Sequence, residues 1–198
     1  MRTLCFVTRN ANKLKEIQHI LGDGIRLVTL ADIGCIDPIP EPFETIHENS
    51  KAKALYVWEH YGVDCFADDS GLVIPALNGE PGVHSAHYVG PQRDDKANIR
   101  LVWEKLKNKA NREAYFLTVI TLVLDGEIHV FEGKAEGEIR MEEKGQNGFG
   151  YDPIFQPQGY EVTFAEMSLD EKSKISHRSK AFQKLKAFLQ TVSPDSTL

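Results

Sequence analysis

Two long runs of β-forming residues, 115–124 and 127–131, are separated only by the dipeptide Asp125-Gly126. Asp-Gly between two such runs is a strong signal for a β-hairpin, because both central residues of the favoured turn take positive φ. The second run continues toward Ile139. The sequence therefore predicts one long antiparallel pair in the second half of the chain.

The first half instead alternates helix and strand. Apolar spacing predicts a buried strand over residues 3–8, a helix over 13–21, a helix over 48–60 that stops at Gly62, and a strand over 64–67. Hairpins are antiparallel, whereas helical crossovers join parallel strands. We therefore expect an α/β fold with a mixed central sheet flanked by helices.

The rest of the chain adds helices and no linker or repeat. Residues 99–106 have helical spacing, residues 168–171 have the spacing of a capping box, and a last helix follows Ser176. The polar tail, 191–198, is expected to fray. We predict a single domain over residues 1–198, built as one core or as two lobes of one sheet.

Composition excludes several classes of protein. No run approaches the roughly 20 apolar residues of a membrane helix, and the apolar start over residues 4–7 breaks too soon for a signal peptide. Cys5, Cys35 and Cys65 form no C-x-x-C pair, so we expect small, reduced core residues. These observations predict a cytoplasmic protein that does not engage a membrane.

The charge distribution is uneven. The net charge of −6 argues against a protein that coats nucleic acid through bulk electrostatics. One zone without acidic residues is basic, and its cations are Lys172, Lys174, Arg178, Lys180, Lys184 and Lys186. Such a run is commonly a solvated helix face, although a compact polyanion such as a nucleotide would also fit it.

Two adjacent carboxylates, Asp68 and Asp69, stand where the apolar strand is expected to end in a turn at Gly71. Burying bare charge is expensive, so carboxylates at a strand end meet a cation, solvent or hydrogen-bond donors. Mg²⁺ prefers such oxygen ligands. Asp-Asp-Ser-Gly is also ordinary turn chemistry, and the residues alone leave both interpretations open.

Three further segments could bind a ligand. Polar residues 8–13 meet a helix start, which suits a phosphate or a simple cap. Glu41 lies between two prolines in a loop that cannot be helical, so it could supply a further carboxylate. Phe149 lies among glycines and could stack on a base or fold back onto the core. Residues 176–178 offer several donors at a helix start, suited to carbonyl or phosphate oxygens or to a surface cap.

In order along the chain, these segments resemble the inosine triphosphate pyrophosphatases, also called non-canonical purine NTP or dITP/XTP pyrophosphatases. The resemblance spans nearly the whole chain. Its motifs are Thr8-x-Asn10-x-x-Lys13, Glu41 with Thr45 and Glu48-Asn49, Ala67-Asp68-Asp69-Ser70-Gly71-Leu72, Gly148-Phe149-Gly150-Tyr151-Asp152-Pro153, Glu171-Lys172-Ser173 and Ile175-Ser176-His177-Arg178.

The resemblance implies Mg²⁺-dependent hydrolysis of ITP, dITP and XTP between the α and β phosphates, giving a monophosphate and pyrophosphate. It also implies the elongated two-lobed α/β fold of the Maf/Ham-like proteins, with the nucleotide in the cleft, and a homodimer. Matching positions give Glu41 and Asp69 as Mg²⁺ ligands, with Asp69 the candidate base for water.

The resemblance also implies two groups of substrate contacts, one to the phosphates and one to the base. The nucleotide, mainly its phosphates, would be held by Thr8, Arg9, Asn10, Ala11, Asn12, Lys13, Lys53, Ser70 and Lys172. The base would be surrounded by Phe149, Gly150, Tyr151, Asp152, His177 and Arg178. Donors facing the 6-position would donate to a carbonyl oxygen there and would oppose the amino group of adenine.

The chain also departs from the family pattern. His87 stands where arginine is common, and Arg9 stands where a small residue is frequent. A rival enzyme class is the Maf-like nucleotide pyrophosphatases, whose Ser-Pro-Arg-Arg-type start is absent here. A rival of another class is an inert nucleotide- or RNA-binding module using Phe149 and the basic helix.

Overall fold

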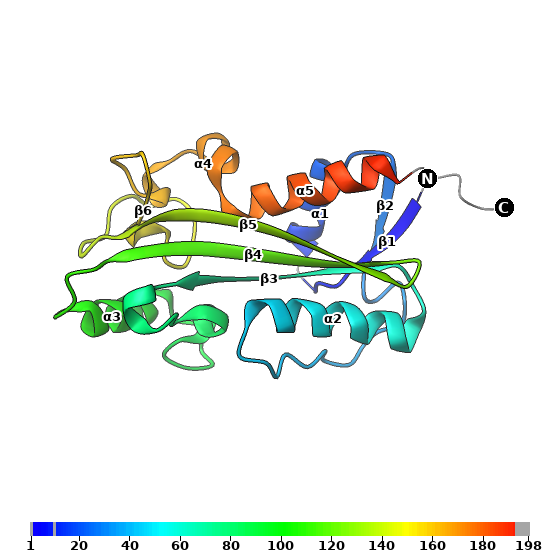
Figure 1. Cartoon of the computed structure of the whole chain (residues 1–198), viewed down its shortest axis with the longest axis horizontal. Coiled ribbons are helices and arrows are strands. Elements are labelled where there is room, and N and C mark those ends of the chain that lie inside the picture. Colours follow the sequence, from blue (N-terminus) through cyan, green and yellow to red (C-terminus); the bar gives the residue numbers. More distant parts are fainter. Residues whose placement is uncertain (1, 10, 193–198) are drawn as a thin grey trace. The chain divides into compact units, whose positions relative to one another are not determined.

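The computed structural model describes residues 2–9 and 11–192, with residues 11–13, 15 and 16 described by their backbone only. Its six strands form one sheet in the order β2-β1-β3-β4-β5-β6 (Figure 1). The strands are β1 (Arg2–Phe6), β2 (Ile25–Val28), β3 (Cys65–Val73), β4 (Glu113–Leu124), β5 (Glu127–Ile139) and β6 (Phe155–Pro157). β1 pairs in parallel with β2 and β3, whereas β5 and β6 are antiparallel. The predicted mixed α/β fold is confirmed.

Five α-helices accompany these strands in the described residues: α1 (Ala11–Leu21), α2 (Ile46–Tyr61), α3 (Asp95–Leu106), α4 (Leu169–Ile175) and α5 (His177–Thr191). Short 3₁₀ helices cover Pro75–Leu77, Gly82–His87, Asp152–Ile154 and Phe164–Glu166. α2 begins two residues earlier than predicted, because the Thr45 hydroxyl accepts from the Glu48 N–H and caps the helix. The expected fraying of the tail concerns residues 193–198, which lie outside the described residues.

The chain divides into two compact units. Unit 1 contains Met1–Asp69, Val119–Glu132 and Ala181–Leu198, and unit 2 contains Ser70–Thr118 and Gly133–Lys180. β3, β4 and β5 each contribute residues to both units.

The core of unit 1 follows the two-residue period of its strands. Leu4 and Phe6 of β1 pack with α1 and α5, whereas Cys5 and Val7 pack with α2. Successive side chains of a strand point to opposite faces, so both faces of this sheet are buried. The residues of one strand therefore contribute to two separate apolar layers, one on each face of the sheet.

Unit 2 has its own apolar core. Phe116 of β4 meets Phe155 at a ring-centroid distance of 4.7 Å and Phe164 at 6.0 Å. Ile99 and Val102 of α3 belong to the same buried cluster. The helix and the strand predicted from apolar periodicity thus both bury their apolar faces in this unit.

The hairpin at Asp125-Gly126 forms as predicted. Both residues have positive φ, 51° and 84°, and they join the neighbouring strands β4 and β5. By contrast, the prediction that a strand ends at Ala67 is wrong, because β3 continues to Val73. The long strand β4 is the hydrogen-bonded neighbour of β3 in the sheet, and Ser70 Oγ of β3 lies 2.8 Å from Thr118 Oγ1 of β4.

Two lysines of the basic zone, Lys180 and Lys184, have structural contacts. β6 pairs only with the last three residues of β5, Gly137 to Ile139. Earlier along β5, Lys184 donates to the Glu132 carbonyl at 2.7 Å and Lys180 to the Lys134 carbonyl at 2.8 Å. Lysine ammonium groups thus satisfy carbonyls along the part of β5 that β6 does not cover, where lysines also discourage pairing with another strand.

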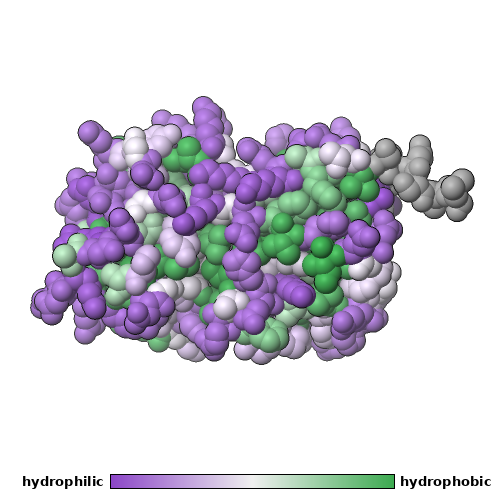
Figure 2. All heavy atoms as spheres, viewed as in Figure 1, coloured by the Kyte–Doolittle hydropathy of each residue, from purple (hydrophilic) through white to green (hydrophobic). Residues whose placement is uncertain are grey.

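Hydrophilic side chains cover most of the face drawn in Figure 2, and apolar residues show between them in small groups. Among the described residues, no helix combines the length and the apolar character needed to cross a membrane.

The three cysteines are buried free thiols of unit 1, as predicted. Burial, with the nearby Cys35 and Asp32, raises the pKa of Cys5 to about 12, and burial with Cys5 and Asp64 nearby raises the pKa of Cys65 to about 12. An ordinary thiol has a pKa near 9.0. These two groups therefore stay protonated at neutral pH.

We expect Cys5 and Cys65 to react with iodoacetamide at pH 8 roughly 1000-fold more slowly in the folded protein than in urea, because only the thiolate reacts. Their raised pKa values stabilise the fold fully below about pH 9, and that contribution is lost as the pH rises toward about 12. Peptide mass spectrometry of timed samples measures the labelling. Comparable rates in buffer and in urea would contradict the raised pKa values.

Candidate active site

One ammonium group of unit 1 lies close to two carboxylates and to one backbone carbonyl. Lys53 of α2 donates to the Asp68 backbone carbonyl at 2.7 Å. Its Nζ also lies 3.5 Å from Glu41 Oε2 and 3.9 Å from Asp69 Oδ1. Glu41, Lys53, Asp68 and Asp69 are called the acid–lysine set below. The structure thus brings together three predicted site residues from three separate segments.

Burial imposes an unfavourable desolvation free energy on the charges of the acid–lysine set. The Lys53 side chain is 12% exposed and that of Asp69 16%, and Asp68 is almost fully buried. Half-buried and buried charges need counter-charges or donors, since desolvation otherwise penalises them. Glu41 differs, because its side chain is 48% exposed at the surface. Two carboxylates sharing one cation within 4 Å form a donor set that fits a divalent cation.

The described residues contain no group of three or more His, Cys, Asp or Glu side chains able to hold a metal on its own. The acid–lysine set offers two side-chain carboxylates near one point, Glu41 and Asp69. Mg²⁺ commonly binds through one or two carboxylates and takes its other ligands from water and phosphate. The donor set therefore fits a Mg²⁺ ion that arrives with a phosphorylated ligand better than it fits a metal ion held by protein ligands alone.

The predicted phosphate-binding segment is only partly described. Asn10 lies outside the described residues. Ala11, Asn12 and Lys13 form the first turn of α1, and their side chains are outside the description too. Thr8 is half-buried just after β1, and its backbone N–H donates to Phe6. The segment does place a helix start directly after a central strand, which is a common geometry for binding phosphate.

Arg9 has contacts that its sequence position did not predict. Its Nη2 donates to the Ile36 carbonyl at 3.0 Å and to the Asp37 carbonyl at 2.5 Å. This nitrogen therefore connects the segment after β1 to the loop that leads to Glu41. A direct contact of Arg9 with substrate stays a prediction.

A second cluster lies in unit 2, around the glycine-rich loop. Asp152 Oδ2 accepts from Lys172 Nζ at 2.5 Å and from the Phe149 backbone N–H at 3.0 Å. Lys172 Nζ lies 5.3 Å from the centroid of the Phe149 ring, and the Arg178 guanidinium carbon lies 5.9 Å from it. Phe149, Asp152, Lys172, His177 and Arg178 are called the aromatic–cation set.

The Phe149 ring is 64% exposed, so it does not fold back onto the core. Its position depends on the glycines beside it. Gly148 has φ of 74°, and a Cβ there would lie 2.0 Å from Asp152 Oδ2. Only glycine fits such a close approach in the left-handed region. An exposed ring flanked by two cations is a suitable platform for a planar ligand.

His177 is buried and neutral. Its ring stacks on Phe116 at 4.8 Å, with an interplanar angle of 14°. Burial, and then the charges of Arg178, Lys172 and Lys180, lower the pKa of His177 well below its usual value. Within the described residues, His177 Nδ1 and Arg178 Nε are buried without a hydrogen-bond partner. Buried polar atoms are rarely left so, and ligand atoms would satisfy them.

The other predicted residues of this region have mainly positioning contacts. The Gly150 N–H donates to Asp95 Oδ2 at 2.9 Å, and the Tyr151 hydroxyl donates to the Ser85 carbonyl at 2.7 Å. Burial, with the nearby Tyr88 and Asp95, raises the Tyr151 pKa. Ser70 Oγ lies 2.8 Å from Thr118 Oγ1. The first two bonds fix the glycine-rich loop, and the third links β3 to β4.

Sequence reasoning assigned no role to two supporting residues, although one of them, Asn49, lies in a quoted motif. Phe116, beneath His177, looked like any other apolar residue of a strand, and nothing in the sequence marked its partner. Asn49 is buried and binds the Phe43 backbone with both amide atoms. Its signal was present, because a polar amide on the apolar side of a helix needs partners.

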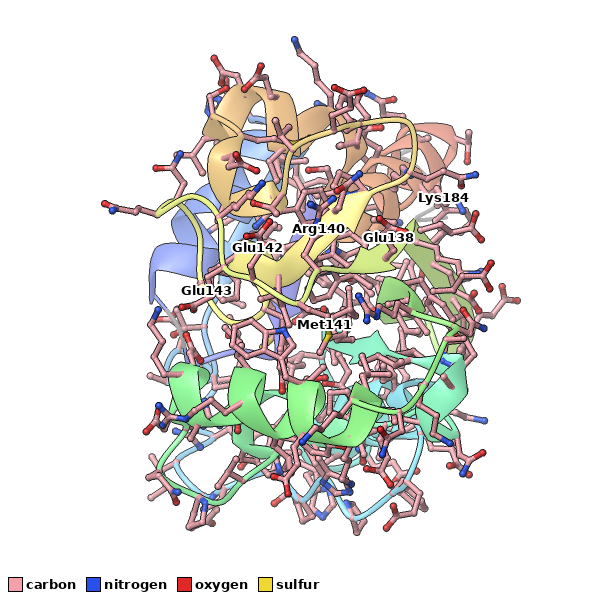
Figure 3. All side chains as sticks on the ribbon, turned by 90° about the vertical axis from the view of Figure 1, so that its left-hand side faces the viewer. Glu138, Arg140, Met141, Glu142, Glu143 and Lys184 are labelled. Atoms are coloured by element: carbon pink, nitrogen blue, oxygen red, sulfur yellow. The ribbon has the colours of Figure 1, made fainter. Side chains whose placement is uncertain are left out.

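Two surface cavities of unit 2 contain none of the predicted site residues. One, of about 430 Å³, is lined by Arg112, Glu138, Ile139, Arg140, Met141 and Glu142 (Figure 3). Its charges are paired locally, with Arg140 3.6 Å and Lys144 3.1 Å from Glu142. The other, of about 570 Å³, is lined in part by Tyr115, Lys134 and Tyr160. The chemistry-bearing residues thus lie outside both cavities.

The protein has the mixed α/β fold that the sequence predicts, and it contains both the acid–lysine set and the aromatic–cation set. The Ham1 family model matches residues 4–188, and the chain belongs to the Ham1 family. A dITP/XTP pyrophosphatase of Christiangramia forsetii is 52% identical over 186 residues, covering 94% of this chain and 98% of that protein.

More distant relatives agree. A dITP/XTP pyrophosphatase of Bacillus subtilis is 42% identical, covering 96% of this chain and 98% of that protein. The solved structure of the Ham1 protein from Staphylococcus aureus matches with a TM-score of 0.92 at 35% identity, covering 97% of this chain and all of that chain. The predicted family and its fold are therefore confirmed.

Proposed function

We propose that this protein hydrolyses dITP, ITP and XTP to the nucleoside monophosphate and pyrophosphate, and so removes deaminated purines from the nucleotide pool. The observation that carries the proposal is the presence of both an acid–lysine set and an aromatic–cation set in a chain 52% identical to a protein named dITP/XTP pyrophosphatase. The first set suits phosphate chemistry and the second suits a base.

In this proposal unit 1 acts on the phosphates. Glu41 and Asp69 would hold Mg²⁺, which would neutralise phosphate charge and make an attacking water more acidic. Lys53, 12% exposed, gives a fixed positive charge beside the phosphates. Thr8, Asn10 and Lys13 at the start of α1 bind phosphate oxygens.

Asp69 takes the proton of the attacking water on a carboxylate oxygen. The water oxygen forms the new bond to phosphorus, while the bond between the α-phosphorus and the bridging oxygen breaks. The electron pair leaves with pyrophosphate. A lysine at 3.9 Å keeps the Asp69 carboxylate in place before the proton transfer.

Unit 2 acts on the base. Phe149 stacks on the purine, and Lys172 donates to Asp152 with its Nζ over the Phe149 ring, 5.3 Å from the ring centroid. His177 is neutral, so one ring nitrogen donates and the other accepts. Arg178 has only donors, which suit the 6-carbonyl of hypoxanthine or xanthine and oppose the 6-amino group of adenine.

We further propose that the protein acts as a homodimer in the cytoplasm. The family resemblance implies the dimer, and the apolar pattern of the sequence predicts the location. Sedimentation velocity at micromolar concentration tests the dimer, for which a species of twice the 22.3 kDa chain mass is expected.

The test of function is Mg²⁺-dependent hydrolysis of ITP, XTP, ATP and dTTP, with phosphate and pyrophosphate resolved by ion chromatography. We expect pyrophosphate from ITP and XTP, little product from ATP or dTTP, and loss of activity in EDTA that Mg²⁺ restores. Orthophosphate from ITP would show that another bond breaks. Preferred turnover of dTTP would favour a Maf-like enzyme, and binding without turnover would favour an inert module.

A further inference from the structure

The proposed metal ligand Glu41 lies in a segment without regular structure. Residues 38–43 form no helix or strand, and Pro38, Pro40 and Pro42 have no N–H to donate. The Glu41 side chain is half exposed, and its Oε2 lies 3.5 Å from Lys53 Nζ. Residues 36–43 are called the Glu41 loop below. Something other than a ladder of backbone hydrogen bonds must fix it.

Asn49 holds the far end of the Glu41 loop. Its Oδ1 accepts from the Phe43 N–H at 3.0 Å, and its Nδ2 donates to the Phe43 carbonyl at 2.9 Å. Both bonds therefore go to one backbone residue, as a neighbouring strand would supply them. Asn49 is only 3% exposed and lies in the first turn of α2, so its amide is itself fixed.

Arg9 holds the near end. A single guanidinium nitrogen donates to two successive carbonyls, Ile36 at 3.0 Å and Asp37 at 2.5 Å. The planar guanidinium has a fixed geometry that one ammonium on a flexible stem does not reproduce. Arg9 directly follows Thr8, so it ties the predicted phosphate-binding segment to the Glu41 loop.

We propose that Arg9 and Asn49 are positioning residues that hold the Glu41 loop at both ends and so fix the Glu41 carboxylate beside Lys53 and Asp69. This inference rests on the proposed role of Glu41 as a metal ligand. It assigns to Arg9 a role through the loop rather than through substrate phosphate. Arg9 is also a residue in which this chain departs from the common family pattern.

The experiment compares Arg9→Met, Arg9→Lys and Asn49→Ser with Arg26→Met, a matched control at an exposed arginine of β2. Hydrogen–deuterium exchange of peptides covering residues 36–45 is measured without nucleotide. We expect faster exchange in all three test variants and unchanged exchange in the control. Hydrogen–deuterium exchange can be measured even if a variant is inactive. Unchanged exchange in the peptides outside residues 36–45 shows that the variant is folded.

The second readout is the Mg²⁺ concentration for half-maximal ITP hydrolysis. We expect it to rise about 10-fold in Arg9→Met and in Arg9→Lys, with kcat at saturating Mg²⁺ within about 3-fold of the parent. Rescue by Arg9→Lys, with a change only in KM for ITP, would overturn the inference and make Arg9 a phosphate ligand. Unchanged loop exchange in all three variants would overturn it as well.

Glu41→Gln separates this inference from the proposed function. If Glu41→Gln leaves the Mg²⁺ requirement unchanged, the metal assignment in the proposed function fails, whatever the exchange data show. If Glu41→Gln raises the requirement while Arg9→Met and Asn49→Ser do not, only the positioning inference fails.

Discussion

Replacing Asp69 with asparagine is expected to lower ITP turnover by about 10²–10⁴-fold, the range associated with loss of a positioned acid or base. Asparagine keeps the shape of the side chain but cannot take the proton of water. It also removes one of the two carboxylates that lie near the Lys53 ammonium. The measurement is kcat with ITP at saturating Mg²⁺.

The fold should survive this change, because Asp69 is not part of an apolar cluster and asparagine still accepts hydrogen bonds. Glu59→Gln, which removes one exposed carboxylate of α2, is the matched control and should behave as the parent. Circular dichroism checks that both variants are folded. A folded Asp69→Asn protein with near-normal kcat would remove Asp69 from the mechanism.

Replacing Asp152 with alanine is expected to destabilise the protein by about 3–5 kcal/mol, as found when one partner of a buried ion pair is removed. The Asp152 side chain is 4% exposed and that of Lys172 is 17% exposed, so the lysine charge would lose its counter-charge in a poorly solvated place. The Phe149 N–H would lose its acceptor too. Urea denaturation measures the free energy of unfolding.

Two further variants identify the cause. Asp152→Ala combined with Lys172→Met should recover at least about 1 kcal/mol of the loss, because the unpaired ammonium is then gone. Glu142→Gln removes a surface partner of Lys144, 3.1 Å away, and should change stability by less than about 1 kcal/mol. Equal stability of Asp152→Ala and the parent would show that the pair is not required for folding.

Local signals in the sequence predicted much of the secondary structure. Asp125 and Gly126 specify their turn through their own φ preferences, and β4 and β5 follow on either side. Helix ends were predictable for the same reason, since the capping box of Ser168 with Glu171 forms as its spacing indicates. These features depend on residues only a few positions apart.

Local sequence patterns were less reliable where contacts with a distant segment decide the structure. The Asp-Asp-Ser-Gly sequence has the composition of a turn, yet β3 runs through it beside β4. Arg9 and the basic zone are similar cases, because their donors are used on backbone carbonyls 27 or more residues away. No local pattern names such distant acceptors.

The sequence by itself determined the family, the α/β class and the identity of the candidate site residues, because motif order and periodicity are properties of the chain alone. Only the tertiary structure decided how those residues are used. It placed Lys53 between Glu41 and Asp69, buried His177 against Phe116 so that it stays neutral, and attached the Glu41 loop to Arg9 and Asn49. Burial and hydrogen-bond partners depend on segments brought together by folding, and these set the charge and position of each group.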